Sequence, residues 1–252
     1  MTSLRVIQGA DDTNIVLQYR RAIQLWSSHC ADAAVFGEAA AYANAKLSQI
    51  EEANCVHGVL DAQRAAEVAR YFADANSRPL AWHNPETSPA IEGLSERRVE
   101  IWRLDYISHA LPQTHTDLMI IPARAAFTQL HQIAAIMRPA ASPEQAAEAA
   151  MCHLDDSHVD AIIALRQGEP VAYASVISTG QVGFIMDLFV REEARLQGIG
   201  NAMAGRMLDI CARSLFRTVC CPLLEANEIG KRFVEKLGFS LAHTVMQRAV
   251  VA

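Results

Sequence analysis

The stretch Gly183-Phe-Ile-Met-Asp-Leu-Phe-Val190 is followed by the charged turn Arg191-Glu-Glu-Ala-Arg-Leu-Gln197 and then by Gly198-Ile-Gly200-Asn201, which opens the run Ala202–Ile210. An apolar run, a charged turn and two glycines predict a strand, a tight loop and a helix, in that order. Because glycine has no Cβ, the backbone at Gly198 and Gly200 can approach a ligand closely, and the first N–H groups of the helix point at that ligand. The stretch therefore predicts an anion site that fits a pyrophosphate.

Two families of dinucleotide site place glycines in such a loop. The Rossmann fingerprint requires Gly or Ala three residues after its second glycine, and Met203 stands there. The order Arg-x-x-Gly-x-Gly after a strand that ends in Val190 resembles instead the pyrophosphate loop of the GNAT superfamily, the acyl-CoA-dependent N-acetyltransferases. The resemblance implies that Phe189 and Val190 meet the pantetheine of the cofactor. It also implies that the pyrophosphate is held by Arg195, Leu196, Gln197, Gly198, Ile199, Gly200 and Asn201. The alternative is a turn whose glycines serve packing alone.

A second motif, Asn227-Glu-Ile-Gly-Lys-Arg-Phe-Val-Glu-Lys-Leu-Gly-Phe239, is similar to a GNAT helix that ends in the same Glu-Lys-Leu-Gly-Phe. By this resemblance Asn227 and Phe233 bind the cofactor, and Gly238 takes the left-handed conformation that ends the helix. Many members of the superfamily carry Tyr directly before the Glu-Lys pair, where it protonates the departing CoA thiolate. This chain has Val234 there, which leaves the general acid unassigned.

The implied reaction, attack of an amine on the acetyl-CoA thioester, needs a base and a donor for the oxyanion. Asp187 is the first candidate base and Glu225, two residues before Asn227, is the second. Strand alternation puts Met186 and Asp187 on opposite faces, so that only one of them enters the active cleft. Asp187 could alternatively satisfy backbone N–H groups. His153 and His158 could grip the substrate or be solvated loop residues, and we expect no metal site, because the cluster around them lacks ligand spacing.

Composition narrows the class of protein. The chain has 252 residues, of which 51% are hydrophobic and 20% charged, typical of one large or two modest globular domains. A net charge of −6 argues against nucleic-acid binding and suits a cationic amine substrate. The apolar stretches are too short to cross a bilayer and no signal peptide is evident, so we expect a cytoplasmic protein without membrane contact. The six cysteines show no Cys-x-x-Cys spacing and are expected to be buried thiols.

The chain divides into two parts on either side of the polar segment Ser108–His115. Residues 117–252 are expected to form a complete GNAT domain: an α/β (α+β) fold with a mixed, mostly antiparallel twisted sheet flanked by helices. Residues 1–112 are interpreted as a degenerate GNAT-like domain in tandem, or as an unrelated helical domain, with a predicted helix at Glu38–Lys46. Shifting the chain by 143 residues sets the two parts in register and places Cys55 and His57 against Gly198 and Gly200. The first part would then lack a phosphate site.

The function predicted from these observations is an N-acetyltransferase. It would move an acetyl group from acetyl-CoA to the amine of a small molecule or amino-acid-like substrate, by direct attack in a ternary complex. The alternative is a non-catalytic acyl-CoA sensor that keeps the cofactor site. The chain is expected to be a monomer or a homodimer, because a tandem pair can complete its own pseudo-dimer.

Overall fold

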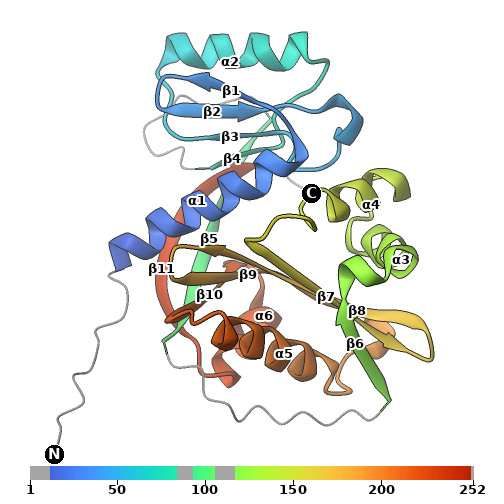
Figure 1. Cartoon of the computed structure of the whole chain (residues 1–252). Helices are drawn as coiled ribbons and strands as arrows, with labels where there is room; N and C mark the ends of the chain where they lie inside the picture. The colour runs from blue at the N-terminus through green and yellow to red at the C-terminus, as the bar shows by residue number, and fades with distance from the viewer. Residues whose placement is uncertain (1–11, 84–92, 106–116, 251–252) are drawn as a thin grey trace, which may run out of the picture.

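The computed structural model describes residues 12–83, 93–105 and 117–250. The polar segment predicted to link the two parts, Ser108–His115, lies outside these residues. Within them the strands form one mixed sheet (Figure 1). In spatial order its strands are β1 (Ala33–Phe36), β2 (Ala39–Tyr42), β3 (Cys55–His57), β4 (Ala81–His83), β11 (Ser240–Ala249), β5 (Ser95–Leu104), β10 (Thr218–Leu224), β9 (Val182–Val190), β8 (Glu169–Thr179), β7 (Val159–Arg166) and β6 (Leu118–Pro122).

Helices cover both faces of this sheet. One face of β7 to β10 packs on the crossover helix α5 and on α6, and the other packs on α1, α3 and α4. A separate core joins α2 to β1 to β4. The helices are α1 (Asp12–Cys30), α2 (Ala62–Asp74), α3 (Phe127–Met137), α4 (Pro143–Met151), α5 (Ile199–Arg213) and α6 (Glu228–Lys236), with 3-10 turns at Ala45–Leu47, Ala123–Ala125 and Glu192–Ala194. None of the helices in the described residues has the length and apolarity that a membrane span requires.

The two parts of the chain exchange strands at the centre of the sheet. β5, from the first part, pairs antiparallel with β10 and β11 of the second part. β11 in turn pairs antiparallel with β4 of the first part. The register of β5 and β11 runs from Ser95 opposite Ala249 to Arg103 opposite Ser240. The sheet is therefore continuous across both parts, and α1 packs against β8, β9 and β11 at their junction.

Each part contains one parallel crossover, β3-α2-β4 and β9-α5-β10. The helix of the first crossover has Asp61 as its N-cap, where the second has Gly198. Cys55 and His57 lie inside β3. The 143-residue offset, which set these two residues against Gly198 and Gly200, is therefore wrong in this detail: strand and loop lengths differ between the two parts.

The helix predicted at Glu38–Lys46 is wrong. Ala39–Tyr42 forms β2, and only Ala45–Leu47 makes a short 3-10 turn. All four residues of β2 are buried, and β2 pairs with β1 on one side and β3 on the other. Alanine has the highest helix propensity, but such a preference is worth less than about 1 kcal/mol per residue, and the pairing of β2 with two neighbouring strands outweighs it.

Candidate active site

Strands β9 and β10 pair only at their first residues. Their parallel register joins Val182–Phe184 to Thr218–Cys220 and stops there. Beyond this point β9 follows β8 and β10 follows β5, so the ends of the two strands part. Met186 and Asp187 of β9, with Pro222 and Leu224 of β10, line a cavity at this point. The sheet is thus open where the sequence predicted the cofactor and the base.

A β-bulge in β9 changes the direction of its side chains. Val176 of β8 lies opposite Ile185 and Ser175 lies opposite Asp187, which leaves Met186 as an extra residue. Such an insertion breaks strand alternation. Met186 packs with the cluster around α1, and Asp187 accepts a hydrogen bond from the buried Ser175 hydroxyl at 2.7 Å. The prediction that only one of Met186 and Asp187 faces the cleft is therefore wrong, because both line the same cavity.

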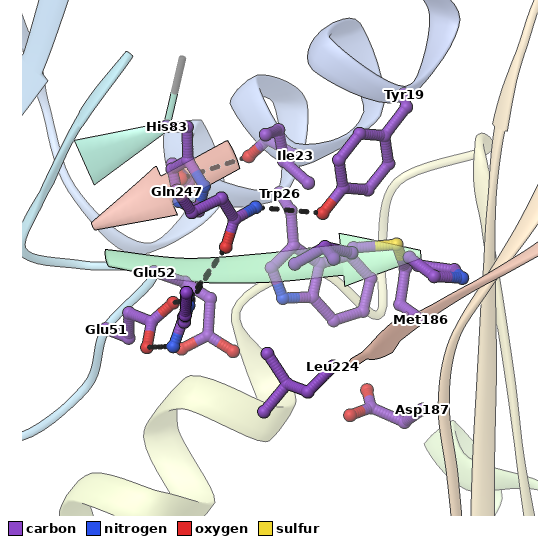
Figure 2. A pocket seen from close by; sticks show the side chains of 14 residues that line it. Tyr19, Ile23, Trp26, Glu51, Glu52, His83, Met186, Asp187, Leu224 and Gln247 are labelled. Atoms are coloured by element: carbon purple, nitrogen blue, oxygen red, sulfur yellow. Dashed lines mark hydrogen bonds and ion pairs between the residues drawn. The ribbon is translucent and has the colours of Figure 1, made fainter. Parts of the chain in front are cut away.

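The cavity has a volume of about 180 Å³ and is drawn in Figure 2. Its walls come from segments far apart in the chain, and the part contributed by residues 12–99 carries most of its polar groups. Its lining residues are Tyr19, Ile23, Trp26, Ser27, Glu51, Glu52, His83, Arg97, Val99, Met186, Asp187, Pro222, Leu224 and Gln247. Aromatic and aliphatic walls with a few convergent polar groups are typical of a small-molecule site.

A hydrogen-bonded chain of side chains crosses the cavity. Arg97 binds the Glu51 carboxylate through both terminal nitrogens, with Nη1 2.9 Å from Oε2. Arg97 Nε and Nη2 donate to Gln247 Oε1 at 3.1 and 3.0 Å, and Gln247 Nε2 lies 3.1 Å from the Tyr19 hydroxyl. Burial raises the pKa of Glu51, although Arg97 opposes this effect. The network fixes the polar wall in one arrangement.

The negative charges of the cavity are unequally compensated. Arg97 pairs with Glu51, and Arg138 Nη2 lies 3.0 Å from Glu52 Oε1. Burial acts to raise the pKa of Glu52, but the Arg138 guanidinium and a backbone hydrogen bond together outweigh it and hold that pKa below its usual value. Within the described residues Asp187 forms no salt bridge, and the hydrogen bond it accepts comes from Ser175. Burial acts to lower the pKa of Arg138, but the charges of Glu52 and Asp187 raise it, so Asp187 also feels the Arg138 guanidinium at longer range. The cavity therefore presents one carboxylate without a direct ion-pair partner, a favourable place for an ammonium group.

On the α5 face of the sheet, the loop before that helix exposes backbone donors. Gly198 is the N-cap residue with φ of 81°, in the left-handed region, and no side chain caps the helix. The Gln197 side chain does not cap the helix. Its Oε1 accepts from Arg166 Nη1 at 2.7 Å and its Nε2 donates to the Glu193 carbonyl at 2.9 Å. Arg195 Nε donates to the Val190 carbonyl at 3.1 Å. No side chain therefore caps the first N–H groups of α5, which are the groups that the glycine pattern predicts to bind an anion.

The other residues predicted to bind the cofactor lie around this loop. A Cβ built on Gly200 would meet the Phe233 ring at 3.5 Å and Val190 Cγ2 at 3.9 Å, so these three residues are neighbours. Phe189 packs on the opposite face, with the cluster around α3 and α4. Asn227 caps α6, because its Oδ1 accepts from the Gly230 N–H at 2.9 Å. The Phe189 side chain therefore lies on the face of the sheet opposite Val190, Gly200 and Phe233.

Several candidate residues stand outside the cavity. Glu225 is half-exposed and pairs with Arg98 at 3.5 Å, and the structure does not bring it to Asp187. Val234 is 3% exposed in the core beneath α5 and carries no proton to donate. His158 is exposed and bonds Asp156, whereas His153 is buried and stacks on Trp26 with ring centroids 3.8 Å apart. His153 is therefore a packed residue and not a solvated loop histidine.

Comparison with known proteins identifies the second part of the chain. Residues 127–239 match the model of the acetyltransferase (GNAT) family. No curated protein sequence matches the chain. Among solved structures, the fold is similar to that of a functionally unknown conserved protein from Staphylococcus epidermidis ATCC 12228, at 13% identity and a TM-score of 0.63, with 88% of this chain and 95% of that chain covered.

Two further structures share the fold. A GCN5-related N-acetyltransferase from Kribbella flavida has 14% identity and a TM-score of 0.61, with 94% of this chain and 96% of that chain covered. A tandem GNAT protein from the clavulanic acid biosynthesis pathway has 15% identity and a TM-score of 0.55, with 74% and 68% covered. The matched region contains the parting strands, the β9 bulge and the Gly198 turn. Residues 127–239 of this chain therefore form a domain of the GNAT family, and the fold around them is that of GNAT proteins.

Proposed function

We propose that this protein transfers an acetyl group from acetyl-CoA to an amine by direct attack within a ternary complex. The observation that carries the proposal is the position of Asp187. It lies at the bulge of β9, on the wall of an anionic cavity, where β9 parts from β10. The open N-terminus of α5 lies on the other face of the same strand pair. In this proposal acetyl-CoA reaches the amine through the gap where β9 and β10 part.

For acetyl-CoA, the proposed contacts are backbone groups. The N–H groups at Ile199, Gly200 and Asn201 would bind the pyrophosphate, and the free edge of β9 near Val190 would meet the pantetheine. A backbone N–H at that edge is the proposed donor to the oxyanion. The fit is supported by the left-handed Gly198, which has no side chain in the way and whose helix is not capped by a side chain.

For the amine, the proposed site is the cavity of about 180 Å³. That volume favours a small or amino-acid-like acceptor. A protonated amine would be drawn to Asp187, which would then take its proton, directly or through a water molecule. No acid is assigned for the leaving group, because Val234 stands at the position of the family's Tyr. A thiol pKa of about 8.5 lets CoA leave as a thiolate without a strong donor.

We further propose that residues 1–112 form a GNAT-like domain that binds no CoA and serves as the acceptor wall. Asp61 supports this interpretation. Its Oδ1 accepts from the Arg64 N–H at 2.8 Å, so a carboxylate already occupies the N-terminus of α2, and it would repel a phosphate. A cytoplasmic location, and a monomer or homodimer, remain predictions.

The test compares two carboxylates. Asp187→Asn should lower kcat by about 100-fold or more, the usual contribution of a general base, while the Kd for acetyl-CoA stays within about twofold. Glu225→Gln is the matched control, since Glu225 lies outside the cavity, and it should keep the wild-type rate. Calorimetry gives the Kd and release of the CoA thiol gives the rate. Equal rates for wild type and Asp187→Asn would remove Asp187 as the base. Tight acetyl-CoA binding by the wild type without turnover on any amine would favour the acyl-CoA sensor.

A further inference from the structure

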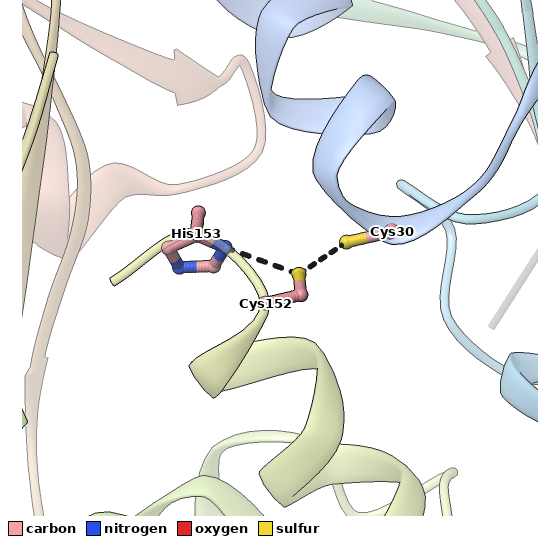
Figure 3. Close-up of side chains that lie close together, drawn as sticks. All are labelled: Cys30, Cys152 and His153. Carbon is pink, nitrogen blue, oxygen red and sulfur yellow. Dashed lines mark hydrogen bonds between the residues drawn. The ribbon is translucent and has the colours of Figure 1, made fainter. Parts of the chain in front are cut away.

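Behind the cavity, the last residue of α1 meets the residue that follows α4. Cys30 Sγ lies 2.9 Å from Cys152 Sγ, and His153 Nδ1 lies 3.4 Å from Cys152 Sγ (Figure 3). The two cysteines are 122 positions apart in the sequence, so the folded chain alone brings them together. This separation is shorter than an ordinary contact between two sulfur atoms, and a small movement would bring the sulfurs to bonding distance.

The two thiols differ in access to solvent. Cys30 is 5% exposed and His153 is 1% exposed, whereas Cys152 is only partly buried. A reagent from solution therefore reaches Cys152 more readily than Cys30. This is the arrangement of an attacking thiol with a second, shielded thiol behind it.

The surroundings also favour the thiolate of Cys152 over that of Cys30. As a thiol, Cys152 donates to the Ala149 carbonyl at 3.3 Å, and as a thiolate it accepts from Cys30 and His153. The hydrogen bond from Cys30 is the largest influence and lowers the pKa of Cys152, and His153 acts in the same direction against burial. The pKa of Cys30 is raised, because Cys30 donates that hydrogen bond and is buried.

A metal ion is a poorer occupant of this cluster. Two thiolates on one tetrahedral zinc ion lie about 3.7 Å apart, since each Zn–S bond is about 2.3 Å long. The sulfurs of Cys30 and Cys152 are much closer than that. Their spacing suits a sulfur–sulfur bond better than a shared metal.

We propose that Cys152 is a peroxide-reactive modification site and that Cys30 resolves it to a reversible Cys30–Cys152 disulfide. In the first step the Cys152 thiolate attacks one oxygen of hydrogen peroxide, the O–O bond breaks, hydroxide leaves and a sulfenic acid forms. In the second step the Cys30 sulfur attacks the Cys152 sulfur, its proton goes to the leaving hydroxyl group and water departs. Two thiols are oxidised, one peroxide is reduced and two waters result. A small dithiol reverses the reaction by exchange.

The disulfide would tie α1 to α4 at the back of the cavity. Trp26, one turn before Cys30, lines the cavity and stacks on His153, the neighbour of Cys152. The bond would therefore act on the acceptor wall, a consequence that rests on the proposed function. Formation of the disulfide does not rest on the proposed function, because it is detected from the protein's mass and its free thiols without measuring turnover.

The experiment treats the reduced full chain with a slight excess of hydrogen peroxide and measures intact mass without reductant. A loss of about 2 Da, reversed by dithiothreitol, with a linked peptide pair holding Cys30 and Cys152, is expected. Cys30→Ser should instead gain oxygen at Cys152, in steps of about 16 Da. Cys152→Ser should stay unmodified at the same dose, which separates the attacking thiol from the resolving one.

Cys221→Ser is the matched control, because Cys221 is buried and burial raises its pKa to about 12. This variant should lose about 2 Da like the wild type. The proposal is overturned if the six thiols all survive peroxide, if oxidation falls first on another cysteine, or if Cys152 gains oxygen in the wild type without forming the bond.

Discussion

Asp187 depends on its neighbours in β8 and β9 for both its direction and its charge. The bulge at Met186 lets two successive side chains enter the cavity, and Ser175 holds the carboxylate through a hydrogen bond of 2.7 Å. Because Ser175 is fully buried, that hydrogen bond is shielded from water. The side chain is thereby positioned by a neutral hydroxyl and not by a direct salt bridge, and Arg138, the cation whose charge it feels, pairs directly with Glu52.

Gly198 is the residue on which the acetyl-CoA assignment depends most. Gly198→Glu would place a side chain and a negative charge at the N-terminus of α5, so the affinity for acetyl-CoA should fall by about 100-fold or more, the cost of roughly 3 kcal/mol of lost anion binding. Calorimetric titration measures the affinity, and circular dichroism checks that the fold persists.

A glutamate at a second glycine serves as the control, because it shows how much of the lost affinity comes from backbone strain and how much from the charge at the cofactor site. Gly168, in the turn between β7 and β8, has φ of 88°, and a Cβ added there would meet no other atom within 4 Å. Gly168→Glu should therefore carry a similar strain, of about 1–2 kcal/mol, without touching the cofactor site. Wild-type affinity in the folded Gly198→Glu variant, or an equal loss in Gly168→Glu, would contradict the assigned site.

At the scale of elements, β3 and β4 carry a buried pair of histidines. His57 and His83 stack with ring centroids 4.6 Å apart, and Ser27 Oγ lies 3.0 Å from His57 Nε2. Burial lowers the pKa of His57 to about 3. Burial, then the nearby His57 and Arg97, lower the pKa of His83 well below its usual value. Both rings are therefore neutral in the folded chain at neutral pH.

This pair makes stability depend on pH with a defined sign. Below the unfolded pKa of about 6.5, both histidines are protonated in the unfolded chain but stay neutral in the folded chain. The free energy of unfolding should therefore fall by about 1.4 kcal/mol for each histidine and each pH unit of acidification. The contribution is complete above about pH 6.5 and is lost as the pH falls towards the folded value near 3. Urea unfolding at several pH values between 8 and 4 measures it.

The variant His57→Phe keeps a ring in the stack but cannot be protonated. Its dependence on pH should be weaker than that of the wild type by about 1.4 kcal/mol per pH unit below pH 6. At pH 8 residue 57 is neutral in both the wild type and the variant. The difference in their free energies of unfolding at that pH therefore measures the effect of the substitution apart from protonation. The same slope in both proteins would show that His57 does not titrate as its burial requires.

Elements with strong local signals were predictable from the sequence. The strand, loop and helix at residues 183–210 and the helix at 227–238 follow from apolar patterning and glycines, and the family comparison confirms the fold. The helix predicted at Glu38–Lys46 failed because pairing on both sides of β2 outweighs alanine's preference. The bulge in β9 was not foreseeable from β9 alone, because it is defined by the register of β8.

The cavity could not be predicted from the sequence either. Tyr19, Trp26, Glu51 and Arg97 lie in the first part of the chain and meet Asp187 only through the folding of α1 and β5 against the second part. No short motif marks them, since each is an ordinary member of its own segment. The strand, glycine turn and helix at residues 183–210 are local in sequence and could be predicted, whereas the cavity is assembled from distant segments.

At the scale of the whole molecule, the exchange of β5 and β11 joins the two parts of the chain. Residues 117–252 alone would lack β5, which leaves the inner edges of β10 and β11 without a partner. We expect this fragment to aggregate or to unfold without cooperativity, and coexpression with residues 1–116 to restore a soluble complex. Size-exclusion chromatography and thermal melts measure both outcomes. A monomeric fragment with a cooperative melt like that of the full chain would show that the shared sheet is dispensable.

The central claim is that one opening in the sheet binds acetyl-CoA and delivers its acetyl group to an amine. Its most direct test is release of the CoA thiol by the purified full chain across a panel of amines and amino acids, after calorimetric titration with acetyl-CoA. We expect one equivalent of acetyl-CoA to bind, and turnover with small cationic amines but not with the matching alcohols. Failure of the full chain to bind acetyl-CoA would contradict this claim.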